Sequence, residues 1–447
     1  MKSTSYDLVV IGGGPAGVEA IREAGLLGLR SAIILNAPAG GRAAKGSLVP
    51  SKVWLAAAEE MDHLHHPLAT RALSDPPRPD LGKIKQRITA QSEATVQWSR
   101  AEIDKAGARL ITGTGKLLGP NQVKVEAEEG DPEILTTRFV LIATGSGPSF
   151  SPGLKPDMKR IIAPRLASGL TEIPESLIMA GGGVTGTEYA YAFAALGTRV
   201  TILQSNGQLL PRMDTDISQA FARYLESTLP ITIHTGDGVA SMALEENEVR
   251  ATTRSGKIYR AQYGFIATGR QPDPSWQDPA GPALAADEQG FIQVDGHAMT
   301  SVEGIYAAGD VTGAPMLANR ALMQARIAVR HMVDGSSSPW NQHPVIEGVY
   351  THPPVAQIGD MSPDPAARWI IKSYDELLKA RLKDVGYGKL KIKVDTATGM
   401  ILGAAAFGLQ APDLLAPIQT AMLNGIHYDR LRGQVLAYPG FAELVSL

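Results

Sequence analysis

The sequence predicts an α/β protein in which a strand, a glycine-rich loop, a helix and a second strand follow one another twice. Short apolar runs at Asp7–Ile11 and Ser176–Ala180 have the length and continuous hydrophobicity of buried parallel strands. Each run leads into a glycine-rich loop and then into a helical pattern. The chain has 447 residues, enough for about three domains.

The first unit continues from its strand into GGGPAG at Gly12–Gly17, then a helix and a strand at Ser31–Leu35. In such a loop Gly12 allows the tight turn, Gly14 lets a pyrophosphate approach the backbone, and Gly17 lets helix and strand pack closely. Free N–H groups at the helix N-terminus then favour the anion. The pattern predicts a nucleotide site, the alternative being a glycine-rich turn without a ligand.

The second unit has the same layout, with GGGVTG at Gly181–Gly186 and a following strand at Arg199–Leu203. Gly181, Gly183 and Gly186 take the three glycine positions. One such motif is weak evidence, whereas two copies, each between a strand and a helix, predict two nucleotide sites.

The rest of the chain is less regular. Residues 56–130 are expected to be mostly helical, with a clear pattern at Lys83–Ala106, and residues 336–339 (SSSP) resemble a linker. Residues 340–447 form a separate block, with strands near Val345–Tyr350 and Leu390–Val394 and helices near Asp413–Leu423.

Three histidines, His63, His65 and His66, cluster near a predicted helix end. They could bind a metal, but no carboxylate or fourth ligand is evident beside them in the sequence. We therefore expect a solvated helix end and no metal site.

Composition excludes several classes of function. The chain contains no cysteine, which rules out disulfides, thiolate nucleophiles, iron–sulfur clusters and cysteine-bound zinc. Any redox chemistry must then be carried by a bound cofactor. The formal net charge of −3 does not suggest a nucleic-acid partner. The N-terminus lacks a signal-peptide pattern and no run of 18 apolar residues occurs, so we expect a cytoplasmic protein without a membrane span.

Five motifs in order resemble the pyridine nucleotide–disulfide oxidoreductases, such as dihydrolipoamide dehydrogenase and glutathione reductase. They are the FAD loop at Gly12, Gly14 and Gly17; the ATG strand ends at Ala143, Thr144 and Gly145 and at Ala267–Pro272, which includes Gly269; the nicotinamide-nucleotide loop at Gly181, Gly183 and Gly186; GIYAAGD at Gly304–Asp310; and YTHPPVAQIG at Tyr350–Gly359.

The resemblance implies an α/β fold of two Rossmann-like FAD- and NAD(P)-binding domains plus an α+β C-terminal dimerisation domain. The implied division is residues 1–150 and 276–336 for the split FAD domain, 151–275 for the NAD(P) domain, and 340–447 for dimerisation. It also implies FAD as cofactor, with Asp310 holding the ribityl chain of the flavin. NADH or NADPH is the implied substrate, and the implied assembly is a homodimer.

Two departures from the family argue against dithiol chemistry. The family's redox disulfide lies in a stretch that reads GGRAAKGSLVPSK here, with Ala43 and Leu48 at the cysteine positions. The family's C-terminal catalytic histidine is replaced by Tyr438, although Pro439 and Glu443 are retained. A phenol with an ordinary pKa of about 10 is a poor base near neutral pH. The residues therefore disfavour dihydrolipoamide dehydrogenase activity.

Lys52 and Glu188 are retained, and in the family these two residues pair beside the flavin N5. A cation there stabilises negative charge on the reduced ring. The alternatives are a surface lysine at a helix start and an ordinary acid in the first turn of a helix.

In the family, an acid that follows the second strand of a unit holds a ribose, and neither of the two corresponding positions carries an acid here. Asn36 stands at the first and Gln204 at the second, and no cation follows Gln204 until Arg212. NAD specificity usually uses an acid at this place and NADP specificity an arginine. The sequence therefore leaves the choice between NADH and NADPH open.

The vacated disulfide segment is a candidate acceptor site, because Arg42 and Lys45 flank Ala43 and Trp54 follows nearby. An anionic or quinone-like molecule could stack there; alternatively, Trp54 fills lost volume and the cations are solvated. We predict an FAD-dependent NAD(P)H oxidoreductase with a small-molecule acceptor, of quinone or diaphorase type or a transhydrogenase. The alternative is a flavin-binding sensor, interaction or electron-relay subunit.

Overall fold

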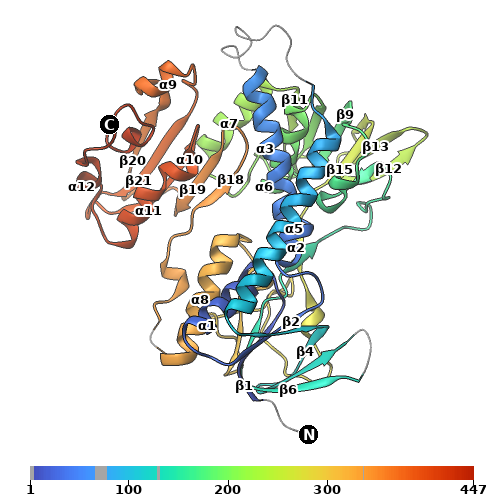
Figure 1. Cartoon of the computed structure of the whole chain (residues 1–447). Helices are drawn as coiled ribbons and strands as arrows, with labels where there is room; N and C mark the ends of the chain where they lie inside the picture. Colours follow the sequence, from blue (N-terminus) through green and yellow to red (C-terminus); the bar gives the residue numbers. More distant parts are fainter. Residues whose placement is uncertain (1–4, 66–77, 128–130, 336) are drawn as a thin grey trace. The chain divides into compact units, whose positions relative to one another are not determined.

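The computed structural model describes residues 5–65, 78–127, 131–335 and 337–447 (Figure 1). These residues form two compact units. Unit 1 comprises the described parts of 1–50, 88–149 and 269–343, and unit 2 those of 51–87, 150–268 and 344–447. Residues 51–87 thus belong to unit 2, whereas the sequence-based division placed them with residues 1–150. The division into four domain segments stays a prediction.

Unit 1 is built on a seven-stranded sheet whose parallel part runs β3-β2-β1-β6-β17. Its strands are β1 (Ser5–Ile11), β2 (Ser31–Leu35), β3 (Arg109–Thr112), β4 (Thr114–Gly119), β5 (Gln122–Glu126), β6 (Glu133–Ile142) and β17 (Ile305–Ala307). Every residue of β2 is buried, as expected for a central parallel strand. The late strand β17 pairs with β6, so distant parts of the chain complete one sheet.

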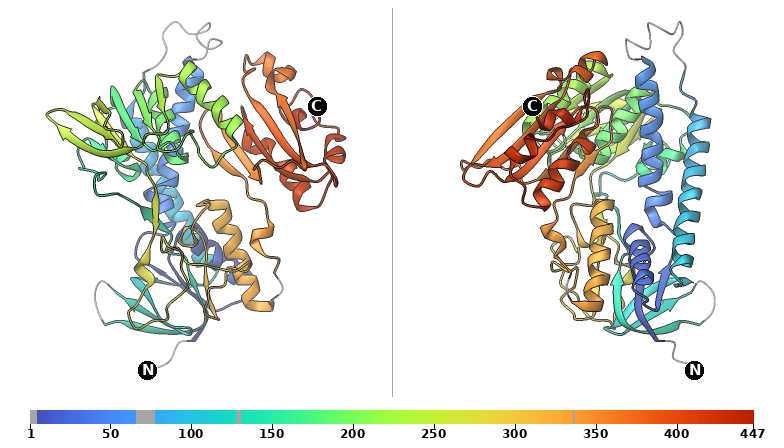
Figure 2. Two further views of the ribbon diagram at one scale, coloured as in Figure 1. Left: turned by 180° about the vertical axis from the view of Figure 1, so that it is seen from behind. Right: turned by 60° about the vertical axis from the view of Figure 1, so that its left-hand side comes forward.

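Helices α1 (Pro15–Leu26) and α8 (Ala318–Asp334) lie side by side in unit 1 (Figures 1 and 2). Their small residues, including Ala20 and Ala325, pack with the sheet in one apolar core. A short β-ribbon, β7 (Ser146–Pro148) with β16 (Arg270–Pro272), completes the strands of this unit.

The prediction that residues 56–130 are mostly helical is correct only in part. In the described part of this range the helices are α3 (Leu48–His65), preceded by the short α2 (Gly41–Lys45), and α5 (Leu81–Lys105). Gly107, with a φ of +70°, follows the end of α5, as is common after helices. The residues beyond it form β3, β4 and β5 instead. The alternation of Val123 and Val125 with polar neighbours is the period-two signal of a half-buried strand.

Unit 2 contains a parallel five-stranded sheet in the order β11-β10-β9-β15-β8. The strands are β8 (Ile161–Ile162), β9 (Ser176–Ala180), β10 (Arg199–Leu203), β11 (Ile231–His234) and β15 (Tyr263–Ile266), with helices α6 (Val184–Ala195) and α7 (Thr215–Thr228). A three-stranded antiparallel sheet consists of β12 (Val239–Glu245), β13 (Glu248–Thr253) and β14 (Ile258–Ala261). The bounds of β9 and β10 are those predicted from the sequence.

The C-terminal part of unit 2 is an antiparallel sheet in the order β18-β19-β22-β21-β20, in orange and red in Figures 1 and 2. Its elements are β18 (Glu347–Val349), β19 (Val355–Gly359), β20 (Ala367–Ser373), α9 (Leu378–Leu382), β21 (Lys389–Asp395), β22 (Ile401–Phe407), α10 (Ala411–Leu414), α11 (Ala416–Leu423) and α12 (Tyr428–Arg432). Strands and helices share one apolar core, which confirms the predicted α+β block.

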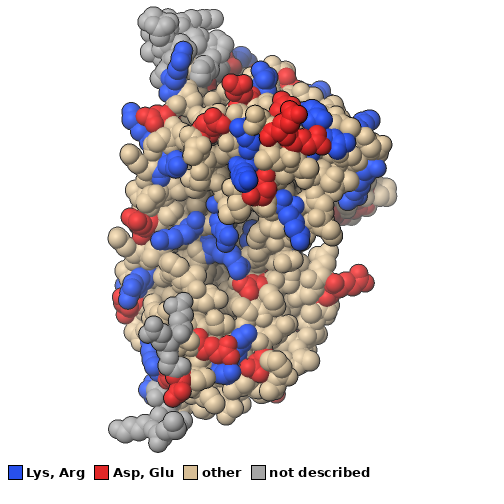
Figure 3. Space-filling view, turned by 90° about the vertical axis from the view of Figure 1, so that its right-hand side faces the viewer, with Lys and Arg blue, Asp and Glu red and all other residues tan. Residues whose placement is uncertain are grey.

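Charged side chains of both signs are interspersed over the face shown in Figure 3, in keeping with the small net charge. None of the helices in the part of the chain that the structure describes has the length and the apolar composition of a membrane span.

Candidate functional site

The first glycine loop forms an open cradle at the N-terminus of α1. Gly12 has a φ of +105°, and a Cβ there would lie 2.5 Å from the Ala143 carbonyl oxygen. A Cβ on Gly17 would lie 1.9 Å from the Gly12 carbonyl oxygen, so only glycine fits this helix–strand contact. A Cβ on Gly14 would meet nothing within 4 Å. The backbone there is therefore accessible to a bound anion.

The second loop reproduces this geometry in unit 2. Gly181 has a φ of +104°, and a Cβ on Gly186 would lie 1.9 Å from the Gly181 carbonyl oxygen. A Cβ on Gly183 would again meet nothing within 4 Å. Both sequence-predicted loops thus have the backbone shape of a pyrophosphate cradle.

The two strand-end amides differ. Asn36, after β2, is exposed. Gln204, after β10, is only 5% exposed, and its side-chain oxygen accepts a hydrogen bond of 3.1 Å from the Gly182 N–H. Arg212, the next cation, forms a 2.5 Å ion pair with Glu347. The side chain at the strand end itself is thus a neutral amide, and Asp237 lies beside it, donating its backbone N–H to the Gln204 carbonyl oxygen.

The first ATG segment is anchored within unit 1. The Ala143 N–H donates to Ile11, and the Thr144 hydroxyl donates to the Asp273 carbonyl oxygen at 3.0 Å. Gly145 has a φ of +74° and accepts a hydrogen bond from the Asp273 N–H. Of the second segment, Gly269 has a φ of +151° and accepts from the Ser149 N–H.

Asp310 begins a short 3₁₀ turn and belongs to a polar network in unit 1. Its carboxylate accepts a 2.7 Å hydrogen bond from the Ser146 hydroxyl and lies 3.4 Å from the Arg270 guanidinium. Arg270 also donates to the Ser146 hydroxyl and carbonyl oxygens. The Asp310 side chain keeps 26% of its surface exposed, so it can still accept a ligand hydroxyl.

Two side chains of the candidate acceptor segment have partners within the protein. Arg42 is bound to Asp273 at 2.6 Å and donates to the Ser146 carbonyl oxygen. Burial acts to raise the pKa of Asp273, but hydrogen bonds from the Ser275 backbone and from Arg42 outweigh it and hold this pKa below its usual value. Trp54 has no exposed surface, and its ring centroid lies 5.5 Å from that of Phe193. Of the two alternatives that the sequence leaves open, this enclosed ring supports the second for Trp54, namely that it fills core volume. An acceptor beside Arg42 and Lys45 stays a prediction.

Lys52 and Glu188 meet in unit 2. The Lys52 ammonium lies 2.7 and 2.8 Å from the two carboxylate oxygens of Glu188. The Lys52 side chain is 33% exposed and that of Glu188 only 6%. A carboxylate this deeply buried requires such charge-assisted bonds.

Tyr350 completes this group and was not singled out from the sequence. Its backbone N–H donates to Glu188 at 3.0 Å, and the Lys52 ammonium lies 4.5 Å from the centre of its ring, a cation–π distance. Burial, together with the negative charge of Glu188, raises the pKa of the Tyr350 phenol. We call Lys52, Glu188 and Tyr350 the lysine cluster.

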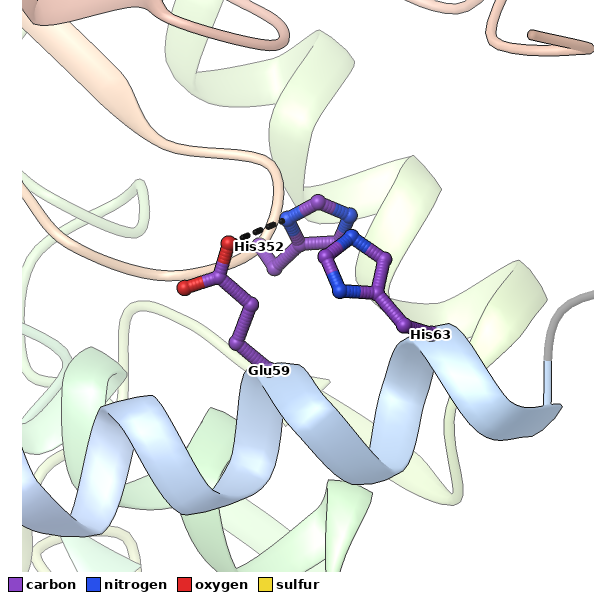
Figure 4. A group of neighbouring side chains, drawn as sticks. All are labelled: Glu59, His63 and His352. Atoms are coloured by element: carbon purple, nitrogen blue, oxygen red, sulfur yellow. Dashed lines mark ion pairs between the residues drawn. The ribbon is translucent and has the colours of Figure 1, made fainter.

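His63 is exposed, as expected near a helix end, but it has unforeseen neighbours (Figure 4). Glu59 lies one turn before it on α3, and His352 comes from the loop between β18 and β19. Burial and the neighbouring His352 lower the pKa of His63. A hydrogen bond with His352 lowers the pKa of Glu59, although burial opposes it. The side chain of His65, and His66, lie outside the described residues.

The positions that depart from the family carry no dithiol machinery. Ala43 is half-buried in α2, and Leu48 begins α3 with 38% exposure. Tyr438 is 70% exposed, and Glu443 accepts a hydrogen bond from the Gly440 N–H. In this chain Glu443 thus holds its own backbone turn.

Comparison with known proteins supports these observations. Residues 6–325 match the pyridine nucleotide-disulphide oxidoreductase family, and residues 345–447 match the dimerisation domain of the same family. The chain is 31% identical to the dihydrolipoyl dehydrogenase of Chlorobaculum tepidum, over 99% of this chain and 96% of that one.

Two other relatives are named for other activities. An NAD(P)H dehydrogenase (quinone) of Mycobacterium tuberculosis is 29% identical over 98% of this chain and 92% of its own. A soluble pyridine nucleotide transhydrogenase of Mycobacterium bovis is 29% identical over 98% and 95%. The crystal structure of LpdA from Mycobacterium tuberculosis superposes with a TM-score of 0.91 at 28% identity, covering 98% of each chain.

Proposed function

Because the chain belongs to the pyridine nucleotide-disulphide oxidoreductase family, we propose that it oxidises NADH or NADPH and delivers the electrons to an acceptor other than a disulfide. The family depends on FAD and uses NAD(P)H, and these are the cofactors of this chain. The observation that carries the proposal is the complete absence of cysteine from a chain that keeps two glycine cradles.

The residues of unit 1 fit FAD. The backbone at Gly14 is open beside the N-terminus of the 12-residue helix α1, where free N–H groups suit a pyrophosphate. We assign the pyrophosphate to Gly12, Gly14 and Gly17, a ribose hydroxyl to the exposed Asn36, and the ribityl chain to Asp310. The strand end Ala143–Gly145 would close this site.

The residues of unit 2 fit a nicotinamide nucleotide, with its pyrophosphate at Gly181, Gly183 and Gly186. The side-chain oxygen of Gln204 supports this loop by accepting a hydrogen bond from the Gly182 N–H. Gly269, at the second strand end, lies in unit 1, and its role toward the nucleotide stays a prediction.

Bound FAD supplies the two-electron acceptor for the hydride of NAD(P)H, which no side chain of this protein can provide. The lysine cluster supplies a fixed positive charge. Glu188 holds the Lys52 ammonium with both oxygens, and the Tyr350 backbone holds Glu188 in turn. A cation that is already oriented would stabilise the negative charge that develops on the flavin ring during its reduction, and the surroundings of the cation would not need to reorganise. We therefore assign Lys52 and Glu188 as the catalytic pair.

A quinone-type small molecule is the first candidate acceptor, supported by the relative that is named an NAD(P)H dehydrogenase (quinone). Transhydrogenation between NADH and NADPH is the second candidate. It is supported by Gln204, whose neutral amide, bonded to the Gly182 N–H, neither attracts nor repels a 2′-phosphate. The matched dimerisation domain supports a homodimer; a cytoplasmic location stays a prediction.

The test is an anaerobic titration of the purified yellow protein with NADH and, separately, with NADPH, followed through the visible absorbance of the flavin. We expect bleaching to end at two electrons per FAD, because no dithiol can store two more. A cysteine-containing relative, titrated alongside, should take up four. If neither nucleotide bleaches a flavin that dithionite reduces, the oxidoreductase proposal fails and a sensor or relay subunit becomes the better explanation.

A further inference from the structure

Glu59, His63 and His352 converge on one point in unit 2, away from both glycine cradles in the sequence (Figure 4). One potential ligand atom from each side chain lies within 4.8 Å of the others. The two imidazole rings meet edge to face, with centroids 4.4 Å apart and an interplanar angle of 72°. The Nδ1 atom of His352 lies 3.5 Å from a carboxylate oxygen of Glu59.

Local structure explains why these side chains meet. Glu59 and His63 are four residues apart on α3, so they project from the same face of the helix, as Figure 4 shows. His352 lies in a loop that is held by a hydrogen bond from the Thr351 hydroxyl to the Pro353 carbonyl oxygen. The site thus combines two exposed side chains with one largely buried imidazole, which is 11% exposed.

Two imidazoles and one carboxylate are a donor set that suits borderline transition-metal ions, Zn²⁺ among them. With bonds of about 2.0–2.2 Å, donors on a tetrahedral ion lie roughly 3.3–3.5 Å apart. Closing the present cluster to that spacing requires movements of roughly an ångström. Glu59 and His63 can make them by rotating exposed side chains, while His352 stays in place.

An ordinary ion pair accounts for only part of this arrangement. A Glu59–His352 contact explains two of the three side chains and leaves the second imidazole without a role. A metal ion uses all three, because a neutral imidazole presents a lone pair to it. Three protein ligands also leave a fourth position for water.

We propose that Glu59, His63 and His352 form a binding site for one divalent transition-metal ion per chain, with Zn²⁺ as the representative ion. The ion would join α3 to the loop that carries Tyr350. Glu59 lies seven residues after Lys52 on α3, about 10 Å along the helix axis, and His352 lies two residues after Tyr350. Bound metal would therefore restrain the helix that carries Lys52 and the loop that carries Tyr350 without contacting either side chain.

The test is isothermal titration of the full-length, FAD-loaded protein with ZnCl₂ after removal of metals by a chelator. We expect one ion per chain, and a higher melting temperature in its presence. Glu59→Gln and His63→Gln should each weaken the affinity by about tenfold or more. Both side chains are exposed, so the variants should fold, and their melting temperatures without metal check this.

Matched controls are Glu60→Gln, the neighbouring exposed acid, and His234→Gln, an exposed histidine of the same unit. Both should titrate like the parent protein. X-ray absorption at the zinc edge should show two imidazoles in the parent and one in His63→Gln. Equal zinc binding by the parent and a Glu59→Gln/His63→Gln double variant would mean adventitious surface binding and would overturn the proposal. The readouts do not depend on turnover, so they stand apart from the proposed oxidoreductase activity.

Discussion

The two glycine cradles of this chain share their backbone and differ in the residues around it. Gly12 and Gly181 have φ values of +105° and +104°, and a Cβ on Gly17 or Gly186 would meet a carbonyl oxygen at the same 1.9 Å. A pyrophosphate is bound by backbone N–H groups, so this part tolerates little variation. The neighbouring side chains are where the two units diverge.

Two pairs of equivalent residues show this divergence. Asn36 and Gln204 each follow the second strand of their unit, yet Asn36 is exposed and Gln204 is buried against the loop. Glu19 and Glu188 each lie two residues after the third glycine, and each is 5% exposed. Glu19 binds Arg22 and Arg326, whereas Glu188 binds Lys52. The same buried acid thus joins helices in one unit and holds the lysine cluster in the other.

Distorting the backbone of either glycine cradle should have the largest effect. Gly17→Ala and Gly186→Ala each force a carbon against a carbonyl oxygen, and overpacking of this kind costs about 1–3 kcal/mol. Gly17→Ala should be purified largely without FAD. Gly186→Ala should retain FAD but resist reduction by NAD(P)H, as measured by flavin absorbance. Gly119→Ala and Gly207→Ala, where a Cβ meets nothing within 4 Å, are the controls and should behave like the parent.

Removing the cation of the lysine cluster should have the next largest effect. Lys52→Gln should slow anaerobic flavin reduction by NAD(P)H on the order of 10²-fold, the scale for losing one stabilising group at a reacting centre. Stopped-flow absorbance measures it. Lys83→Gln, at a side chain that is 82% exposed, should leave the rate unchanged. An unchanged rate in Lys52→Gln would remove this residue from the catalytic assignment.

The two equivalent acids should separate stability from rate. Glu19→Gln removes the negative charge that binds two arginines. It should lower the free energy of unfolding by about 1.5–3 kcal/mol and change the rate of flavin reduction little. Glu188→Gln still accepts from Lys52 but without charge, and should slow reduction about tenfold, or about 1.4 kcal/mol. Denaturant titration and stopped-flow kinetics measure the two. If Glu19→Gln slows flavin reduction as much as Glu188→Gln does, the two acids do not have the different roles assigned to them.

The smallest expected effect concerns the strand-end amides. Gln204→Glu keeps an acceptor for the Gly182 N–H and adds a negative charge that repels a 2′-phosphate. It should raise the ratio of kcat/KM for NADH over NADPH about tenfold. Asn36→Asp, at the equivalent exposed position, should leave this ratio unchanged and slow FAD loss on dilution instead. A shifted ratio in Asn36→Asp would contradict the separate roles given to the two cradles.

Much of the fold was predictable because its signals are local. The loop glycines at Gly12 and Gly181 need positive φ angles, and this requirement is visible in the residue type itself. Strands β9 and β10 are continuous apolar runs with clear ends. The helical prediction failed beyond Gly107, where short strands such as β5 gain their stability from pairing with β6, which a local pattern does not show.

The sequence by itself determined the two cradles, the family and the loss of dithiol chemistry, since each depends on residue types at fixed spacings and on a residue that is absent. Only the tertiary structure decided which side chains meet. Tyr350 reaches Glu188 across 162 residues, His352 reaches Glu59 from another segment, and Trp54 is enclosed in the core. Contacts between distant segments depend on the packing of whole elements, and no local periodicity encodes them.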